Sequence, residues 1–250
     1  MLSEHADRVC TFFAVDFEPH FGVKLGSIAE EIYAEHKPTR ISVTPPVAYN
    51  FAWPEDRILM ILGFQRIAWQ TLGLSAWQKN LKRHSTVMKS ALEAIGAKKL
   101  NRIGFKVQAF LPLSMSHAEL SQLMFGSFLV PAEELQDVCG EVDDPLVQIQ
   151  GKSDDLQYSI VFSAMNSQQI TEQFMHVPNL EHFRSHKFLD TIVKGFHDGI
   201  AKGDCFYLDI DLFQRDVSAD ALGRFIENSL NKCDEIAGAC VRRLKTQPAK

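Results

Sequence analysis

Two aspartates near the end of the chain are the strongest candidates for chemistry. Asp209 and Asp211 alternate with apolar residues in 205–213, a pattern typical of a β-strand with one polar face. Residues two apart on a strand share a face, with Cα atoms roughly 6 to 7 Å apart. Two carboxylates at this spacing suit one Mg²⁺, or two metals as in phosphoryl-transfer enzymes. Asp16, on the polar face of the first predicted strand, is the candidate third carboxylate; the alternative is a solvent-facing side of an antiparallel strand.

A second candidate metal site consists of two histidines. His182 and His186 are four residues apart, so a helix would make them neighbours that could hold one metal ion. The segment lacks the His-Glu-x-x-His arrangement of zinc proteases, and surface or capping histidines are the alternative.

Three aromatic residues form a candidate binding surface. Tyr49, Phe51 and Trp53 alternate along one predicted strand, so their side chains share a face. Facing outward, they would offer aromatic anchors to a protein, a peptide or a flat ligand. Facing inward, they would be part of the core.

The periodicity of apolar residues predicts the elements that position these side chains, and the fold class they indicate is α+β, with antiparallel sheets covered by helices. In the first half we expect a strand at 8–18, a helix at 21–35, a hairpin of strands 40–53 and 57–70, and a helix from 75 to about 95. In the second half we expect a strand at 101–111, a helix at 116–125, a hairpin of 146–151 and 156–165, a helix around 188–196, a strand at 205–213 followed by a turn at 214–217, and a helix at 222–244. Capping boxes of Ser75 with Gln78 and of Ser116 with Glu119 are expected to start two of these helices.

The order of elements repeats between the halves. Each half runs strand, helix, hairpin, long helix, so an internal duplication into two α+β units is a hypothesis. The units would be 1–99 and 100–250, the second with an insertion at about 166–203, or both would form one compact domain.

Bulk properties narrow the class of protein. A formal net charge of −5 over 250 residues argues against broad affinity for nucleic acid or anionic membranes. The N-terminus lacks the pattern of a secretory signal, and the most apolar window, 58–64, is too short to span a bilayer. Five cysteines without a Cys-x-x-Cys pair favour a reducing compartment, and we therefore expect a cytoplasmic protein.

Three short motifs carry a resemblance to other proteins. Phe17-Glu18-Pro19, the strand 102–106 and the strand 207–211 before a long helix resemble a sporadically distributed, uncharacterised family of bacterial proteins. The resemblance implies an accessory gene carried patchily by bacteria, and it implies no activity or catalytic residue.

The sequence thus favours a binding or interaction module that is not an enzyme, with a protein or a small ligand as its partner and no cofactor. The alternative is a metal-dependent phosphoryl-transfer or hydrolytic enzyme that uses Asp209 and Asp211, with a divalent metal as cofactor. The sequence leaves the oligomeric state open.

Overall fold

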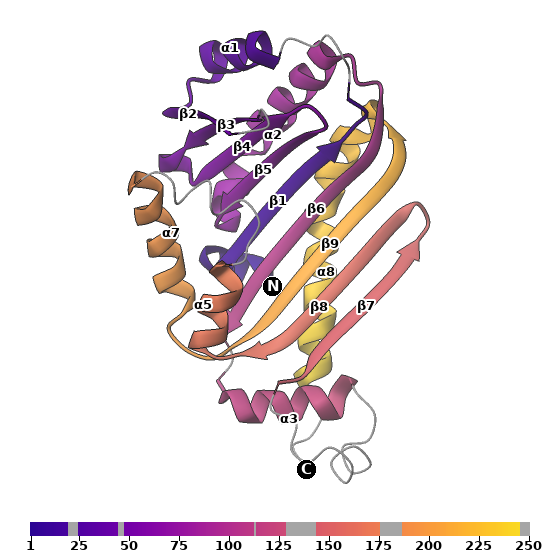
Figure 1. Cartoon of the computed structure of the whole chain (residues 1–250). Coiled ribbons are helices and arrows are strands. Elements are labelled where there is room, and N and C mark those ends of the chain that lie inside the picture. Colours follow the sequence, from indigo (N-terminus) through magenta and orange to yellow (C-terminus); the bar gives the residue numbers. More distant parts are fainter. Residues whose placement is uncertain (20–24, 45–47, 113, 129–143, 176–186, 246–250) are drawn as a thin grey trace.

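The computed structural model describes residues 1–19, 25–44, 48–112, 114–128, 144–175 and 187–245 (Figure 1). Within these residues, nine strands form one antiparallel sheet in the order β2-β3-β4-β5-β1-β6-β9-β8-β7. The strands are β1 (Val9–Asp16), β2 (Arg40–Thr44), β3 (Ala48–Trp53), β4 (Ile58–Gly63), β5 (Arg66–Leu72), β6 (Lys99–Pro112), β7 (Leu146–Ser153), β8 (Leu156–Met165) and β9 (Cys205–Ser218).

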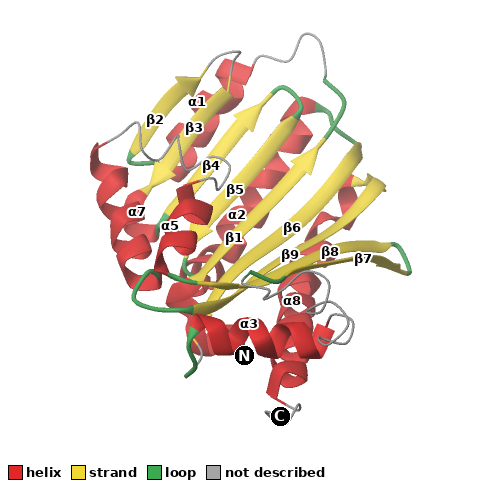
Figure 2. Cartoon of the chain, turned by 60° about the horizontal axis from the view of Figure 1, so that its bottom comes forward, coloured by secondary structure: helices red, strands yellow, loops and turns green. Residues whose placement is uncertain are grey.

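Helices lie on both faces of the sheet, but unequally. The described helices are α1 (Leu25–His36), α2 (Leu74–Ile95), α3 (His117–Phe128), α5 (Ser167–Met175), α7 (Lys187–Ile200) and α8 (Leu222–Lys245), with short 3-10 helices at Leu2–Arg8, Pro54–Asp56 and Ala219–Ala221. The long helices α2 and α8 run behind the sheet in Figure 1, whereas α5 and α7 lie in front of one part of it. Figure 2 shows the same division, and we call these the back face and the front face.

The structure confirms the α+β class and the antiparallel pairing. The sequence predicted more than one sheet, whereas the described strands form a single sheet. All eight strand pairings are antiparallel. β1 pairs with β6 from Val9 opposite Ala109 to Asp16 opposite Arg102, so the sheet is continuous across the proposed boundary at residue 99. In each half the first strand is central and the last strand lies beside it. This common arrangement does not confirm the duplication, which stays a hypothesis.

In the first half, two segments that were each predicted to form one strand contain two strands in the structure. The segments 40–53 and 57–70 contain β2 with β3 and β4 with β5, because tight reversals interrupt both. The alternation of apolar residues resumes after the turn at Phe64 and Gln65, so periodicity alone conceals the break. Pro45 and Pro46 lie outside the described residues, and β2 beside them is an edge strand, where proline is tolerated.

The second half differs from expectation in two places. The predicted turn at 214–217 is part of β9, which stays paired with β6 as far as Ser218 opposite Lys99. The helix α5 was not predicted, although Asn166 and Gln169 form its capping box: Asn166 Oδ1 accepts from Gln169 N at 3.0 Å, and Gln169 Oε1 accepts from Asn166 N at 2.8 Å.

Of two predicted capping boxes, one is confirmed. Ser116 Oγ accepts a hydrogen bond from Glu119 N, and the Glu119 carboxylate accepts one from Ser116 N, which starts α3. The box predicted at Ser75 is wrong, because α2 begins at Leu74 with Gly73 as its N-cap and no side-chain cap. Gly73 has a φ of 99°, a conformation that lets the chain pass from β5 directly into the helix.

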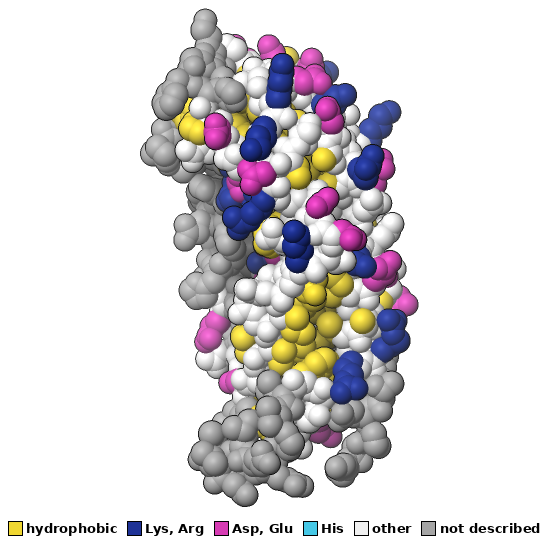
Figure 3. Space-filling model, turned by 90° about the vertical axis from the view of Figure 1, so that its right-hand side faces the viewer, with side chains coloured by type: hydrophobic (Ala, Val, Ile, Leu, Met, Phe, Trp, Pro, Cys, Tyr) yellow, Lys and Arg dark blue, Asp and Glu magenta, His cyan; other side chains and the backbone are white. Residues whose placement is uncertain are grey.

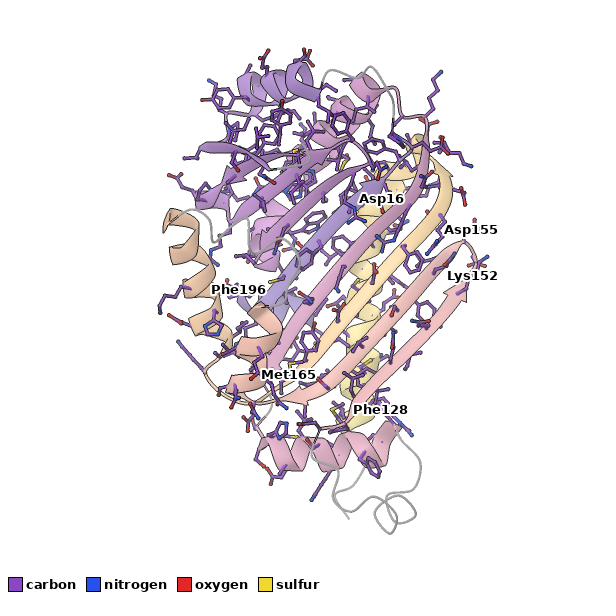
Figure 4. All side chains as sticks on the ribbon, viewed as in Figure 1. Asp16, Phe128, Lys152, Asp155, Met165 and Phe196 are labelled. Atoms are coloured by element: carbon purple, nitrogen blue, oxygen red, sulfur yellow. The ribbon has the colours of Figure 1, made fainter. Side chains whose placement is uncertain are left out.

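The main core lies between the back face and the long helices. It includes Phe13 and Phe105 from the central strands and Trp77 from α2, each at most 1% exposed. A smaller cluster on the front face joins Cys10 and Phe110 to Phe196 of α7. Figure 4 places Phe196 and Met165 where α5 and α7 cross the sheet, far from Asp16 at the other end of β1. Among the described residues, no helix is both long and apolar enough to cross a membrane.

The edge formed by β7 carries exposed apolar side chains. Leu146 is 62% exposed and Ile149 is 41% exposed. Figure 3 looks onto this side of the molecule and shows hydrophobic side chains gathered in its lower half, with charged side chains around them.

Candidate binding pocket on the front face

A row of small residues crosses three strands on the front face. Ala14 of β1 is opposite Ala68 of β5 on one side and opposite Gly104 of β6 on the other. Because alternate residues of a strand share a face, these positions form a shallow floor between rows of larger side chains. They line a pocket of about 150 Å³, which we call the front pocket.

Larger side chains form the walls of the front pocket. One adjacent row consists of Gln70, Phe12 and Lys106, and the row on the other side consists of Arg66, Asp16 and Arg102. All of these except Asp16 line the pocket. The walls therefore combine an aromatic ring, an amide and cationic groups around an apolar floor.

Gln70 is the most unusual of these side chains. It is 2% exposed and lines the front pocket, and neither its Oε1 nor its Nε2 has a hydrogen-bond partner among the described residues. An unpaired buried polar group destabilises the fold by about 1 to 3 kcal/mol. A ligand that satisfied the amide would remove that penalty.

Gln108, also a lining residue, is only partly satisfied. Its Nε2 donates to Tyr207 Oη at 2.9 Å and to Asp209 Oδ2 at 3.1 Å, whereas its Oε1 has no partner in the described part of the chain. Lys106 Nζ lies 2.7 Å from the same Asp209 Oδ2 and fixes that carboxylate. The network holds Gln108 in place and leaves one acceptor unused.

The guanidinium of Arg102 is held against the floor. Arg102 Nη2 donates to both oxygens of Asp211, at 2.9 and 2.8 Å, and the guanidinium carbon lies 4.9 Å from the centre of the Phe213 ring. A Cβ atom on Gly104 would come within 2.7 Å of this guanidinium, so the glycine makes room for it. Burial raises the pKa of Asp211, and the attraction of Arg102 only partly opposes that effect.

In the structure, Asp16 lies far from the other two carboxylates predicted to bind a metal, Asp209 and Asp211. Asp209 and Asp211 share the front face as predicted, but Asp16 is opposite Arg102 whereas Asp211 is opposite Lys106. Asp16 and Asp211 are offset by four residues along the strands, and one strand, β6, lies between theirs, which places their Cα atoms about 16 Å apart for regular strand geometry.

Each of the three carboxylates also has a basic partner. Asp16 binds Arg66, with Nη2 and Oδ2 3.0 Å apart, while Asp209 and Asp211 bind Lys106 and Arg102. In the described residues, no group of three or more His, Cys, Asp or Glu side chains is placed to hold a metal ion. His182 and His186 lie outside the described residues.

The predicted aromatic surface is part of the core. Phe51 is fully buried, Trp53 is 5% exposed, and Tyr49 is half-buried against the same cluster. Trp53 stacks on Trp69 with ring centres 5.4 Å apart. These side chains face the back of the sheet, so the outward-facing alternative does not hold for Phe51 and Trp53.

Sequence reasoning missed the residues that build the front pocket. Gln70, Gln108 and Phe12 belong to no chemical motif, and they come together only through the pairing of β5, β1 and β6. The usable signal was the polar Gln70 within the largely apolar segment 67–72.

Comparisons with known proteins assign neither a family nor a function to the chain. No family model matches the chain, and no curated protein matches its sequence. The resemblance to a bacterial family therefore stays a hypothesis.

Proposed function

We propose that this protein is a binding module that takes a small polar molecule in the front pocket. The observation that carries the proposal is the Gln70 amide, which is buried, lines the pocket and has both polar atoms unpaired within the described chain. Buried polar groups are nearly always hydrogen-bonded, so an exception calls for an explanation. Because Gln70 also lines the front pocket, a ligand bound there could supply the missing partners.

The balance of charge around the pocket supports a polar ligand over a polyanion. The lining cations Arg66, Arg102 and Lys106 are each paired with an aspartate. Their charges are therefore largely compensated before any ligand arrives, and the whole chain carries a formal charge of −5.

A ligand screen against a filled pocket tests the proposal. We expect ligand-observed NMR with mixtures of small polar metabolites to reveal binding to the native protein. The Ala68→Leu variant, which places a larger side chain on the pocket floor, should abolish that binding while leaving the circular dichroism spectrum unchanged. Ligands that bind both proteins equally, or no ligand at all, would contradict the proposal.

A metal-dependent enzyme is the second candidate, and one observation favours it. Asp209 and Asp211 lie beside the front pocket, and the raised pKa of Asp211 indicates a carboxylate whose negative charge is incompletely stabilised. A divalent cation could stabilise that charge, but it would have to displace Arg102 and Lys106 from their ion pairs.

The two candidates are separated by a thermal-shift titration with Mg²⁺, Mn²⁺ and Zn²⁺ after chelator treatment. Selective binding to the native state at one hundred times Kd stabilises it by about 2.7 kcal/mol, a readily measured shift. A rise in Tm that is lost in the Asp209→Asn, Asp211→Asn double variant would favour the enzyme. An unchanged Tm in both proteins would favour the binding module.

A further inference from the structure

We propose that the ligand of the front pocket is a planar nitrogen heterocycle with an amide-type edge, that is, an N–H donor beside a carbonyl or ring-nitrogen acceptor. This inference rests on the proposed binding function and names the chemical class of its ligand. Oxopyrimidines and aminopurines are members of this class.

The amide of Gln70 selects the edge of the ligand. A carboxamide presents a donor and an acceptor side by side, and both atoms of Gln70 lack partners in the described chain. One group that satisfies both is an adjacent donor and acceptor in the same plane, the pairing by which glutamine binds adenine. A carboxylate would satisfy Nε2 and leave Oε1 unpaired against negative charge, so the geometry disfavours acids.

Gln108 adds a second requirement. Its Oε1 is an unused acceptor, whereas its Nε2 is already bonded to Tyr207 and Asp209. On the strand between the two glutamines, Phe12 is opposite Gln70 and diagonal to Gln108, which is opposite Cys10. A heterocycle with a further N–H, as uracil and adenine have, can meet this acceptor as well.

The size of the front pocket fits a small flat heterocycle. Its volume of about 150 Å³ is comparable to that of an engineered cavity that binds benzene. Ala14 and Ala68 carry no side chain beyond Cβ, so a flat molecule can lie along them beside the Arg102 guanidinium, which covers Gly104. Phe12 supplies an aromatic wall, and aromatic rings pair favourably in offset or edge-to-face arrangements.

The fixed guanidinium of Arg102 adds a second flat surface. It lines the pocket, lies against Gly104 and is held by both oxygens of Asp211. Guanidinium planes stack on π systems, so this group favours a planar ring over a saturated one.

The test measures binding of four probes by isothermal titration calorimetry with the full chain. Uracil and adenine carry the donor–acceptor edge, whereas 1,3-dimethyluracil and N6,N6,9-trimethyladenine have every N–H replaced by N–CH3 and so lack the donor. We expect at least one of the unmethylated probes to bind, and its methylated counterpart to bind at least tenfold more weakly.

Variants assign the edge to Gln70. Gln70→Leu keeps the volume of the side chain but removes both polar atoms, and it should weaken binding of the unmethylated probe at least tenfold. The matched control is Gln150→Leu, an exposed glutamine on β7 outside the front pocket, which should leave binding unchanged.

The outcomes distinguish failure of the proposed ligand class from failure of the proposed binding function. Equal affinity for methylated and unmethylated probes, or full affinity in Gln70→Leu, would overturn the amide-edge ligand. Failure of all four probes, together with binding of sugars or amino acids that Ala68→Leu abolishes, would overturn the heterocycle but keep the binding function. Failure of every small molecule would overturn both.

Discussion

Neighbouring residues of one strand point to opposite faces of the sheet, and the two faces have different environments. On β5, Trp69 and Thr71 point into the core behind the sheet, whereas Gln70 points to the front pocket. Both faces contain buried polar atoms without partners among the described residues: His84 and Thr71 behind, Gln70 and Gln108 in front. Of these residues, Gln70 and Gln108 line the front pocket, so burial without a partner does not by itself identify a site.

His84 illustrates the back face. Its ring is fully buried between Trp69 and Trp77, with ring centres 4.6 and 4.5 Å away. Burial lowers its pKa to about 3, with Arg83 adding to the effect and Asp56 opposing it. The ring therefore packs as a neutral aromatic group in the core.

The largest expected contrast comes from two adjacent phenylalanines of β1. Phe13 is fully buried in the main core, whereas Phe12 is half-buried on the front face. Phe13→Ala should lower the free energy of unfolding by about 3 to 5 kcal/mol, and Phe12→Ala by roughly 1 kcal/mol, because only Phe13 leaves a closed cavity. Urea denaturation of both variants measures the difference. Equal losses would mean that the front face is as tightly packed as the back.

The next effect is the pH dependence that His84 confers. The unfolded chain binds a proton at His84 below its ordinary pKa of 6.5, whereas the folded chain resists protonation until about pH 3. Stability should therefore fall as the pH drops from 6.5 towards 3, by about 2 to 3 kcal/mol at pH 4.5. His84→Leu should remove this part of the pH dependence, as urea denaturation at pH 7 and 4.5 would reveal. An unchanged pH profile in His84→Leu would assign the dependence to other groups.

A smaller effect separates the two kinds of unpaired polar group on β5. Thr71→Val and Gln70→Leu each remove buried atoms that lack partners in the described chain, and each should stabilise the unliganded protein by about 1 kcal/mol. Thr71→Val should leave ligand binding unchanged, whereas Gln70→Leu should abolish it. Thermal unfolding with and without ligand distinguishes them. A loss of stability in Gln70→Leu would mean that the amide has a partner in the folded chain.

The sequence predicts those features of the two faces that depend on residues close together in the chain. The face of β9 that carries Asp209 and Asp211, the long helix α8 and the capping box of Ser116 follow from local periodicity and spacing, and the structure confirms them. Local patterns of this kind are complete within a few residues of the chain.

The front pocket needs information that no local pattern holds. Its floor appears only when Ala14, Ala68 and Gly104 are aligned by strands from distant parts of the chain. The same limit explains the aromatic set: alternation places Tyr49, Phe51 and Trp53 together, but the choice of face depends on where α1 and α2 pack. The register between strands and the choice of which sheet face the helices cover are tertiary properties. They decide which polar residue becomes part of a site.

The smallest effect concerns how Gly104 positions Arg102. An alanine at 104 would bring a Cβ atom within 2.7 Å of the guanidinium, but a flexible side chain can move away, so Gly104→Ala should change stability by less than about 1 kcal/mol. The displaced guanidinium would no longer hold both oxygens of Asp211, and ligand binding should weaken. In the Arg102→Ala background the same substitution should have no further effect on stability, so a double-mutant cycle measures the coupling. Zero coupling would show that the arginine does not depend on the glycine, and the flat wall of the front pocket would then have to come from Phe12 alone.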